Sequence, residues 1–199
     1  MKLIIITSPA PVAGEISIIY ELFSLGVHRI HLRRPSWSKS QTREFLSQLP
    51  KECLRNIVLH DHHELVHEYN LGGIHLNSRN PSVLNGYTGA ISRSCHTFQE
   101  IIQYKEQVDY LFLSPIYDSI SKVGVQSAFT DSELSTASNQ GIIDEKVFAL
   151  GGVTPSRVYQ LNEWSFGGAV VLGDFWSKVP SNTWREYLQH WQETLAALS

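Results

Sequence analysis

The sequence has 199 residues, of which 42 % are hydrophobic and 18 % are charged, and its formal net charge is −3. These values exclude a disordered chain, a collagen-like repeat and a disulfide-stabilised scaffold. A chain of this length fits one domain and can bury about 70 % of its unfolded surface. The longest apolar run is well short of the about 18 residues of a membrane helix, and the mild acidity argues against nucleic-acid binding. The two cysteines, Cys53 and Cys95, give no disulfide framework, so we expect a reducing, cytoplasmic setting.

Short β-rich runs recur along the chain. The first, at 2–7, has an apolar core too short for a secretory signal, so we interpret it as a strand. Most of the runs are apolar on both faces, which is typical of a parallel sheet covered on both sides. The eight predicted strands are 2–7, 27–32, 56–60, 72–76, 88–92, 109–114, 146–150 and 168–172.

Helical patterns lie between most of these strands. Thr97 and Glu100 have the spacing of a capping box for a helix over 98–107. Thr154 and Pro155 mark the N-cap and the first position of another helix. The remaining predicted helices are 14–25, 40–49, 63–71 and 182–197.

Strict alternation of strands and helices predicts an α/β fold, and eight units in this length predict one compact TIM (β/α)8 barrel over 1–199. A doubly wound open sheet is the alternative. The link 77–87 is too short and too rich in Asn, Ser, Pro and Gly for a full helix. The stretch 115–131 is a long polar loop of the kind that often carries function. The last helix, rich in Trp and Tyr, is expected in the outer ring of helices, with a homodimer contact as the alternative.

A barrel keeps its chemistry at the carboxyl ends of its strands. Gly151 and Gly152 follow the seventh predicted strand and Gly173 follows the eighth. Because glycine lets backbone amides approach a ligand, this pattern indicates a phosphate site, although tight turns alone explain it equally well. Cationic side chains that could join an anionic substrate are those of Arg33, Arg93 and Lys122, each of which is otherwise a surface charge.

Nine histidines form the one unusual count in the composition. Four of them fall at or near predicted strand ends: His31, His60, His75 and His96. The pairs His60/His62 and His63/His67 have spacings that can bind Zn²⁺. We favour the simpler interpretation that His63 and His67 are solvated histidines on an outer helix.

The chain resembles the thiamine phosphate synthase and thiazole tautomerase (TenI-like) superfamily of compact barrels over about residues 28–176. The pieces that carry the resemblance are His31-Leu32-Arg33, Leu59-His60-Asp61, Gly73-Ile74-His75-Leu76, Ser94-Cys95-His96-Thr97, Asp109-Tyr110, Ser114-Pro115-Ile116-Tyr117 with Ser119, Ser121 and Lys122, Ala149 to Thr154, and Gly168 to Val171. The resemblance implies an enzyme that acts on a phosphorylated thiazole, with no nucleic-acid or membrane partner.

The synthase branch of this superfamily joins a pyrimidine pyrophosphate to a thiazole phosphate, and the resemblance implies Mg²⁺ if this chain belongs to that branch. Arg33 is kept from its Gln-x-Arg-x-Lys stretch, but His31 replaces the Gln and Pro35 replaces the Lys. Asp61 matches one carboxylate of the metal site, whereas Asn80 stands at the position of the second. The pyrophosphate and metal half of the pocket is therefore altered.

The thiazole-phosphate half keeps more of the pattern. The resemblance implies a catalytic Lys122 and a set of substrate-binding residues: Arg33, Ser94, Ser119, Ser121, Gly151, Gly152 and Gly173.

The tautomerase branch moves a proton on a thiazole phosphate carboxylate and needs neither pyrophosphate nor a metal. Its catalytic histidine lies in a Ser-x-His segment, which Ser94-Cys95-His96 matches, so the resemblance implies His96 as the proton shuttle. Strand alternation directs Cys95 away from Ser94 and His96. From the sequence we slightly favour a tautomerase-like enzyme with no cofactor. A thiamine phosphate synthase and a non-catalytic thiazole phosphate-binding relative are the alternatives.

Overall fold

A computed structural model describes residues 1–118 and 127–198, and within them eight parallel strands close into a barrel. Each strand pairs with its neighbour in the chain, and β8 returns to β1 with Lys2 opposite Gly168. This closure confirms the predicted TIM barrel, and the open sheet is wrong. The strands are β1 (Lys2–Ile6), β2 (Arg29–Leu32), β3 (Ile57–Leu59), β4 (Gly73–Leu76), β5 (Ile91–Cys95), β6 (Tyr110–Leu113), β7 (Val147–Leu150) and β8 (Gly168–Val171).

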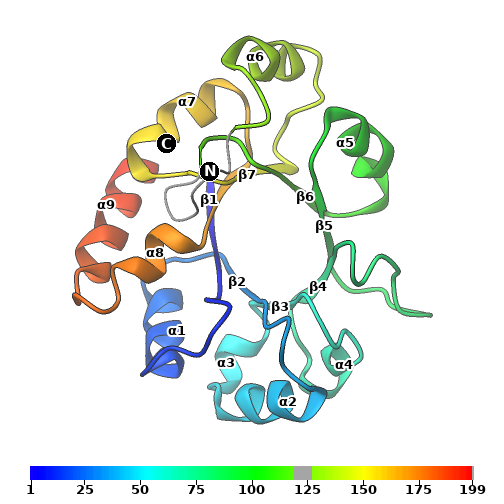
Figure 1. The fold of residues 1–199 in the computed structure, drawn as a ribbon, viewed down its shortest axis with the longest axis vertical. Helices are drawn as coiled ribbons and strands as arrows, with labels where there is room; N and C mark the ends of the chain where they lie inside the picture. The colour runs from blue at the N-terminus through cyan, green and yellow to red at the C-terminus, as the bar shows by residue number, and fades with distance from the viewer. Residues whose placement is uncertain (119–126, 199) are drawn as a thin grey trace.

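Helices surround the barrel, and α9 lies between α7 and α8 in this outer ring (Figure 1). Thr97 caps α5 with the predicted capping box, in which the Glu100 amide donates to Thr97 Oγ1. Thr154 precedes the 3₁₀ turn η2 as predicted, but its hydroxyl makes no capping bond. The helices are α1 (Glu15–Ser24), α2 (Lys39–Gln48), α3 (Lys51–Leu54), α4 (Leu65–Tyr69), α5 (Phe98–Tyr104), η1 (Lys105–Gln107), α6 (Asp131–Asn139), η2 (Pro155–Arg157), α7 (Val158–Glu163), α8 (Gly173–Ser177) and α9 (Trp184–Ala196).

The fifth strand lies three residues later than the predicted 88–92. Pairing with β4 begins at Ile91 and continues to Arg93, and Ser94 and Cys95 still pair with β6. The hydrophobic pattern failed here because the inward side chains of β5 are Ser92 and Ser94, which hydrogen-bond to a histidine. Ser94 and Cys95 are therefore the end of a strand rather than the loop after it.

The barrel interior has an apolar half and a polar half. The residues on β1, β6, β7 and β8 form an apolar cluster of Ile4, Ile6, Tyr110, Phe112, Phe148 and Val170. Opposite them, β2 to β5 contribute buried His31, His60, His75 and Ser92. Within the described residues, the buried polar side chains of the barrel interior therefore gather on the side of β2 to β5.

The aromatic residues near the C-terminus pack into the outer layer. Trp184 and Trp191 are buried, and the indole of Trp176 donates to the carbonyl oxygen of Ile6 across 2.7 Å. This packing matches the expected outer-ring position. In the described part of the chain, the helices are all too short or too polar to span a lipid bilayer.

Candidate active site at the barrel mouth

A cavity of about 430 Å³ opens at the carboxyl ends of the strands. One wall is apolar and is formed by Ile6, Phe112, Leu150 and Leu172. The other wall is polar and comes from β2 to β6 and the loops after them. Its residues are Arg33, His60, Asn77, Ser78, Arg79, Arg93, Ser94, His96, Glu100 and Ser114. This arrangement fits a ligand with a flat apolar ring and a charged group.

Two arginines concentrate positive charge on the polar wall. Arg33 is half-buried, and both its burial and the neighbouring charge of Arg79 lower its pKa. Arg79 donates to the Asp61 carboxylate across 3.1 Å, yet a large part of its side chain stays exposed. Two cationic side chains on one wall of a cavity favour an anionic ligand. Sequence reasoning missed Arg79, although it follows β4 and the strand-end rule applied to its neighbours would have included it.

Arg93, the other arginine of the cavity, is already engaged. Its guanidinium stacks on the Tyr104 ring with 3.8 Å to the centroid, and it donates to the Pro81 carbonyl. Arg93 is thus held by its neighbours, as Arg79 is held by Asp61.

His96 lies immediately after β5 and lines the cavity with Ser94. Its Nδ1 is 2.9 Å from the carbonyl oxygen of Ser114, which can only accept a hydrogen bond. In the neutral ring Nδ1 therefore carries the proton, and Nε2 keeps a lone pair. Cys95 faces the other way into the core, where burial raises the pKa of its thiol to about 12. His96 has the tautomer of a general base, and its catalytic role stays a prediction.

Three buried histidines lie at the base of the cavity, and one of them, His60, lines it. His31 Nδ1 is 2.9 Å from His60 Nε2, and His31 Nε2 is 2.8 Å from the hydroxyl of Tyr110. The ring of His75 stacks on that of His60 with 4.1 Å between centroids. Burial lowers the pKa of all three rings, in the case of His75 to about 3. We call this group, His31, His60 and His75, the histidine cluster.

The two zinc pairs suggested by sequence spacing do not converge. The ring of His62 bonds to the carbonyl of Trp37, away from His60. His67 is exposed, but His63 is buried and bonds to the carbonyl of His75, so its prediction as a solvated histidine was wrong. His63 lies in the turn between β3 and α4, and its contact with the His75 carbonyl on the next strand cannot be seen in sequence spacing.

The backbone conformation after β7 explains why Gly151 and Gly152 are glycines. Gly151 and Gly152 have φ angles of 99° and 64°. A Cβ on Gly152 would lie 2.4 Å from the Asp118 carbonyl oxygen, so no side chain fits against the loop after β6. Gly173 begins the short helix α8. None of the three lines the described cavity, although Leu150 and Leu172 beside them do. Their phosphate-binding role stays a prediction, as do the roles predicted for Ser119, Ser121 and Lys122, which lie outside the described residues.

Asp61, which was predicted to hold Mg²⁺ if the chain is a synthase, is paired with other side chains in this structure. Asp61 already accepts hydrogen bonds from Arg79 and from the Asn80 side-chain amide, the latter across 3.0 Å. Among the described residues, Asp61 belongs to no group of three potential metal ligands. A guanidinium therefore lies at the carboxylate where a divalent cation would have to bind.

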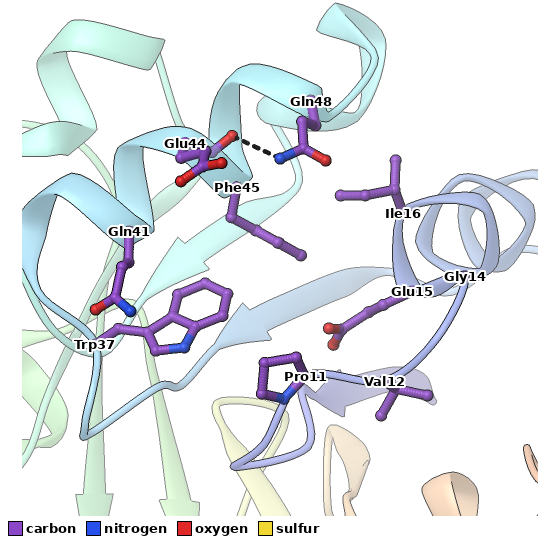
Figure 2. Close-up of a pocket in the computed structure, with 10 residues that line it drawn as sticks. All are labelled: Pro11, Val12, Gly14, Glu15, Ile16, Trp37, Gln41, Glu44, Phe45 and Gln48. Atoms are coloured by element: carbon purple, nitrogen blue, oxygen red, sulfur yellow. Dashed lines mark hydrogen bonds between the residues drawn. The ribbon is translucent and has the colours of Figure 1, made fainter.

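A second hollow, of about 530 Å³, lies outside the barrel between α1 and α2. Figure 2 shows the Glu15 carboxylate pointing toward the side of this hollow that holds Pro11 and Trp37. Both oxygens of Glu15 accept from Nη2 of buried Arg34, whose guanidinium stacks on Trp37 at 4.9 Å. The Glu15 carboxylate is engaged in this ion pair, so we assign no binding or catalytic role to the hollow.

The closed barrel and the arginines at its mouth define a (β/α)8 protein with a cationic cavity at the carboxyl ends of its strands. A sequence model described as thiamine monophosphate synthase matches residues 3–174. A thiamine phosphate pyrophosphorylase from Bacteroides thetaiotaomicron is 38 % identical, with a TM-score of 0.90 and coverage of 98 % of both chains. The chain therefore belongs to the thiamine monophosphate synthase family, which is a family of thiamine biosynthesis. The resemblance detected in the sequence is confirmed.

A more distant structure shares the fold. A thiamine phosphate pyrophosphorylase from Pyrococcus furiosus is 15 % identical, with a TM-score of 0.77 and coverage of 98 % of this chain and 96 % of its own. A comparison with curated proteins finds no match. The 38 % identical structure carries the name thiamine phosphate pyrophosphorylase, which is the synthase activity that we gave as the alternative to the tautomerase-like activity preferred from the sequence.

Proposed function

We propose that this protein is a thiamine phosphate synthase, which joins a pyrimidine pyrophosphate to a thiazole phosphate and releases pyrophosphate. The observation that carries the proposal is the pair Arg33 and Arg79, which lines one wall of a cavity with an apolar wall opposite. Two guanidinium groups fit a pyrophosphate, and the 38 % identical thiamine phosphate pyrophosphorylase favours the synthase over the tautomerase, whose thiazole phosphate carboxylate also has two anionic groups.

The chemistry assigns a task to each wall. The carbon–oxygen bond to pyrophosphate breaks, and a carbon–nitrogen bond to the thiazole ring nitrogen forms. Negative charge grows on the departing pyrophosphate, and fixed guanidinium groups stabilise such charge most strongly in a partly desolvated site. The apolar wall of Ile6, Phe112, Leu150 and Leu172 supports the two flat rings in contact.

Arginine takes the place that a protein-bound Mg²⁺ would occupy in this proposal. Asp61 is tied to Arg79, and the amide of Asn80 adds no negative charge. We therefore assign Asp61 a positioning role, in which it holds Arg79 at the mouth. Positive charge toward pyrophosphate comes from the protein's own side chains.

The test is a product assay with purified protein, pyrimidine pyrophosphate and thiazole phosphate. Thiamine phosphate and pyrophosphate should appear together in a 1:1 ratio, as the proposed reaction requires. Omission of either substrate should stop the formation of both products. Binding of both substrates without any product would instead support the non-catalytic relative.

Thiazole tautomerisation is the second candidate, and one observation favours it. His96 lines the cavity, and its bond to the Ser114 carbonyl leaves Nε2 free to accept a proton. A His96→Ala variant separates the candidates. Loss of proton transfer by about 100-fold or more supports a tautomerase, whereas a small change in thiamine phosphate formation supports the synthase.

A further inference from the structure

The histidine cluster has the arrangement of metal ligands. Each ring of His31, His60 and His75 offers one nitrogen, and these nitrogens all lie within 4.8 Å of one another. His31 Nδ1 and His60 Nε2 face each other across 2.9 Å. Two nitrogens on a zinc ion, with bonds of about 2.0–2.1 Å, lie only slightly farther apart in a tetrahedral site. We propose that His31, His60 and His75 bind a divalent transition-metal ion of the Zn²⁺ class at the base of the cavity.

Hydroxyl groups hold the nitrogens that point away from the cluster centre. His31 Nε2 lies 2.8 Å from the Tyr110 hydroxyl, and His75 Nδ1 lies 2.8 Å from Ser92 Oγ. Ser92 itself donates to the Ile74 carbonyl, so its oxygen accepts from His75 Nδ1–H. His75 therefore keeps its lone pair on Nε2. Metal-binding histidines are oriented in this way by a partner on the other ring nitrogen.

The donor set selects the kind of ion. The cluster offers three imidazoles and, among the described residues, no carboxylate belongs to the group. Imidazole suits zinc, copper, cobalt and nickel, whereas Mg²⁺ and Ca²⁺ need oxygen ligands.

Binding exchanges existing contacts for metal bonds. The His31–His60 hydrogen bond and the bond from Ser94 to His75 Nε2, each shorter than 3 Å, would be replaced. The His60 ring must also turn from its stacked position on His75. Because His60 and Ser94 both line the cavity, the open fourth position faces the place where an anionic ligand would enter.

The proposal is independent of the proposed function, since its readouts do not involve turnover. Metal-stripped wild-type protein is titrated with Zn²⁺ by calorimetry and with Co²⁺ by visible absorption. We expect about one ion per chain, the intense absorption of tetrahedral Co²⁺ and a higher melting temperature with Zn²⁺. The matched variants are His60→Asn, which removes a proposed ligand, and His67→Asn, which changes an exposed histidine outside the cluster.

His60→Asn should weaken binding by about 100-fold or more, because even an outer partner of a ligand contributes about 10–100-fold. His67→Asn should bind like the wild type. Wild-type protein that shows no Co²⁺ absorption and no melting shift with Zn²⁺ overturns the proposal, and the cluster is then a hydrogen-bond network only. Equal binding by wild type and His60→Asn also overturns it. If His60→Asn does not fold, the wild-type titrations decide alone.

Discussion

Arg79 donates to the Asp61 carboxylate across 3.1 Å, at the position where the family pattern leads one to expect a metal-binding carboxylate pair. The contact brings a guanidinium beside Arg33 and removes the free carboxylate that a divalent cation would need. Because of this ion pair, we interpret the barrel mouth as an arginine-lined anion site rather than as a metal site.

Arg79→Ala should lower kcat/KM for thiamine phosphate formation by about 100-fold, because a charged donor to the leaving group is lost. Asp61→Asn should lower kcat/KM by only about tenfold or less, because Arg79 remains and is merely held less firmly. Steady-state kinetics on both variants measures the difference.

Arg43→Ala is the matched control, since Arg43 forms a similar exposed ion pair with Glu68 at 2.7 Å but lies on an outer helix. It should behave like the wild type. A larger loss of kcat/KM in Asp61→Asn than in Arg79→Ala would contradict this account. It would mean that the Asp61 carboxylate supports catalysis by binding a cation.

The buried ion pair beside the outer hollow predicts a large stability effect. Glu15 and Arg34 are both almost fully buried, and Arg34 Nε and Nη1 have no hydrogen-bond partner among the described residues. Removing one partner leaves an unpaired buried charge, so Glu15→Ala should destabilise the fold by about 3–5 kcal/mol. Replacing both, as in Glu15→Leu with Arg34→Met, should cost clearly less than Glu15→Ala alone. Urea unfolding of the two variants measures this, and equal losses would contradict it.

Cys95 should be inert in the folded protein. Its side chain is fully buried, and burial raises the pKa of its thiol to about 12. Iodoacetamide at pH 8 should label it only after unfolding, because the thiolate is the reactive form. Cys95→Ala should keep activity while losing about 1 kcal/mol of stability through the lost packing. Rapid labelling of the native protein, read by mass spectrometry, would contradict this assignment.

His28, at the other end of the barrel, predicts an acid sensitivity. Burial, with the charges of Lys2 and Arg29, lowers its pKa from 6.5 to about 4. Above pH 6.5 the ring is neutral in both states. Between pH 6.5 and 4 the unfolded chain gains a proton that the folded chain resists, so stability falls as pH falls. Across this pH window, the free energy of unfolding of His28→Asn should fall by about 1–2 kcal/mol less than that of the wild type, after solvent screening. Denaturant unfolding at several pH values measures the difference. Parallel curves for the two proteins would contradict it.

The fold was readable from the sequence because parallel strands buried on both faces give continuous apolar runs. β5 was misplaced because Ser92 and Ser94 face the polar half of the interior, where hydrogen bonds to His75 replace apolar contacts. The ion pair between Asp61 and Arg79 and the contact between His31 and His60 join different strand ends. Such contacts depend on the barrel's register and curvature, which residue spacing does not contain.

The measurement that tests the central claim most directly compares two rates in one preparation of the wild-type protein. Thiamine phosphate formation is followed with pyrimidine pyrophosphate and thiazole phosphate, and tautomerisation is followed with the thiazole phosphate carboxylate. Our account predicts sustained thiamine phosphate formation with matching pyrophosphate release. Tautomerisation at a catalytic rate with no thiamine phosphate formed would contradict it.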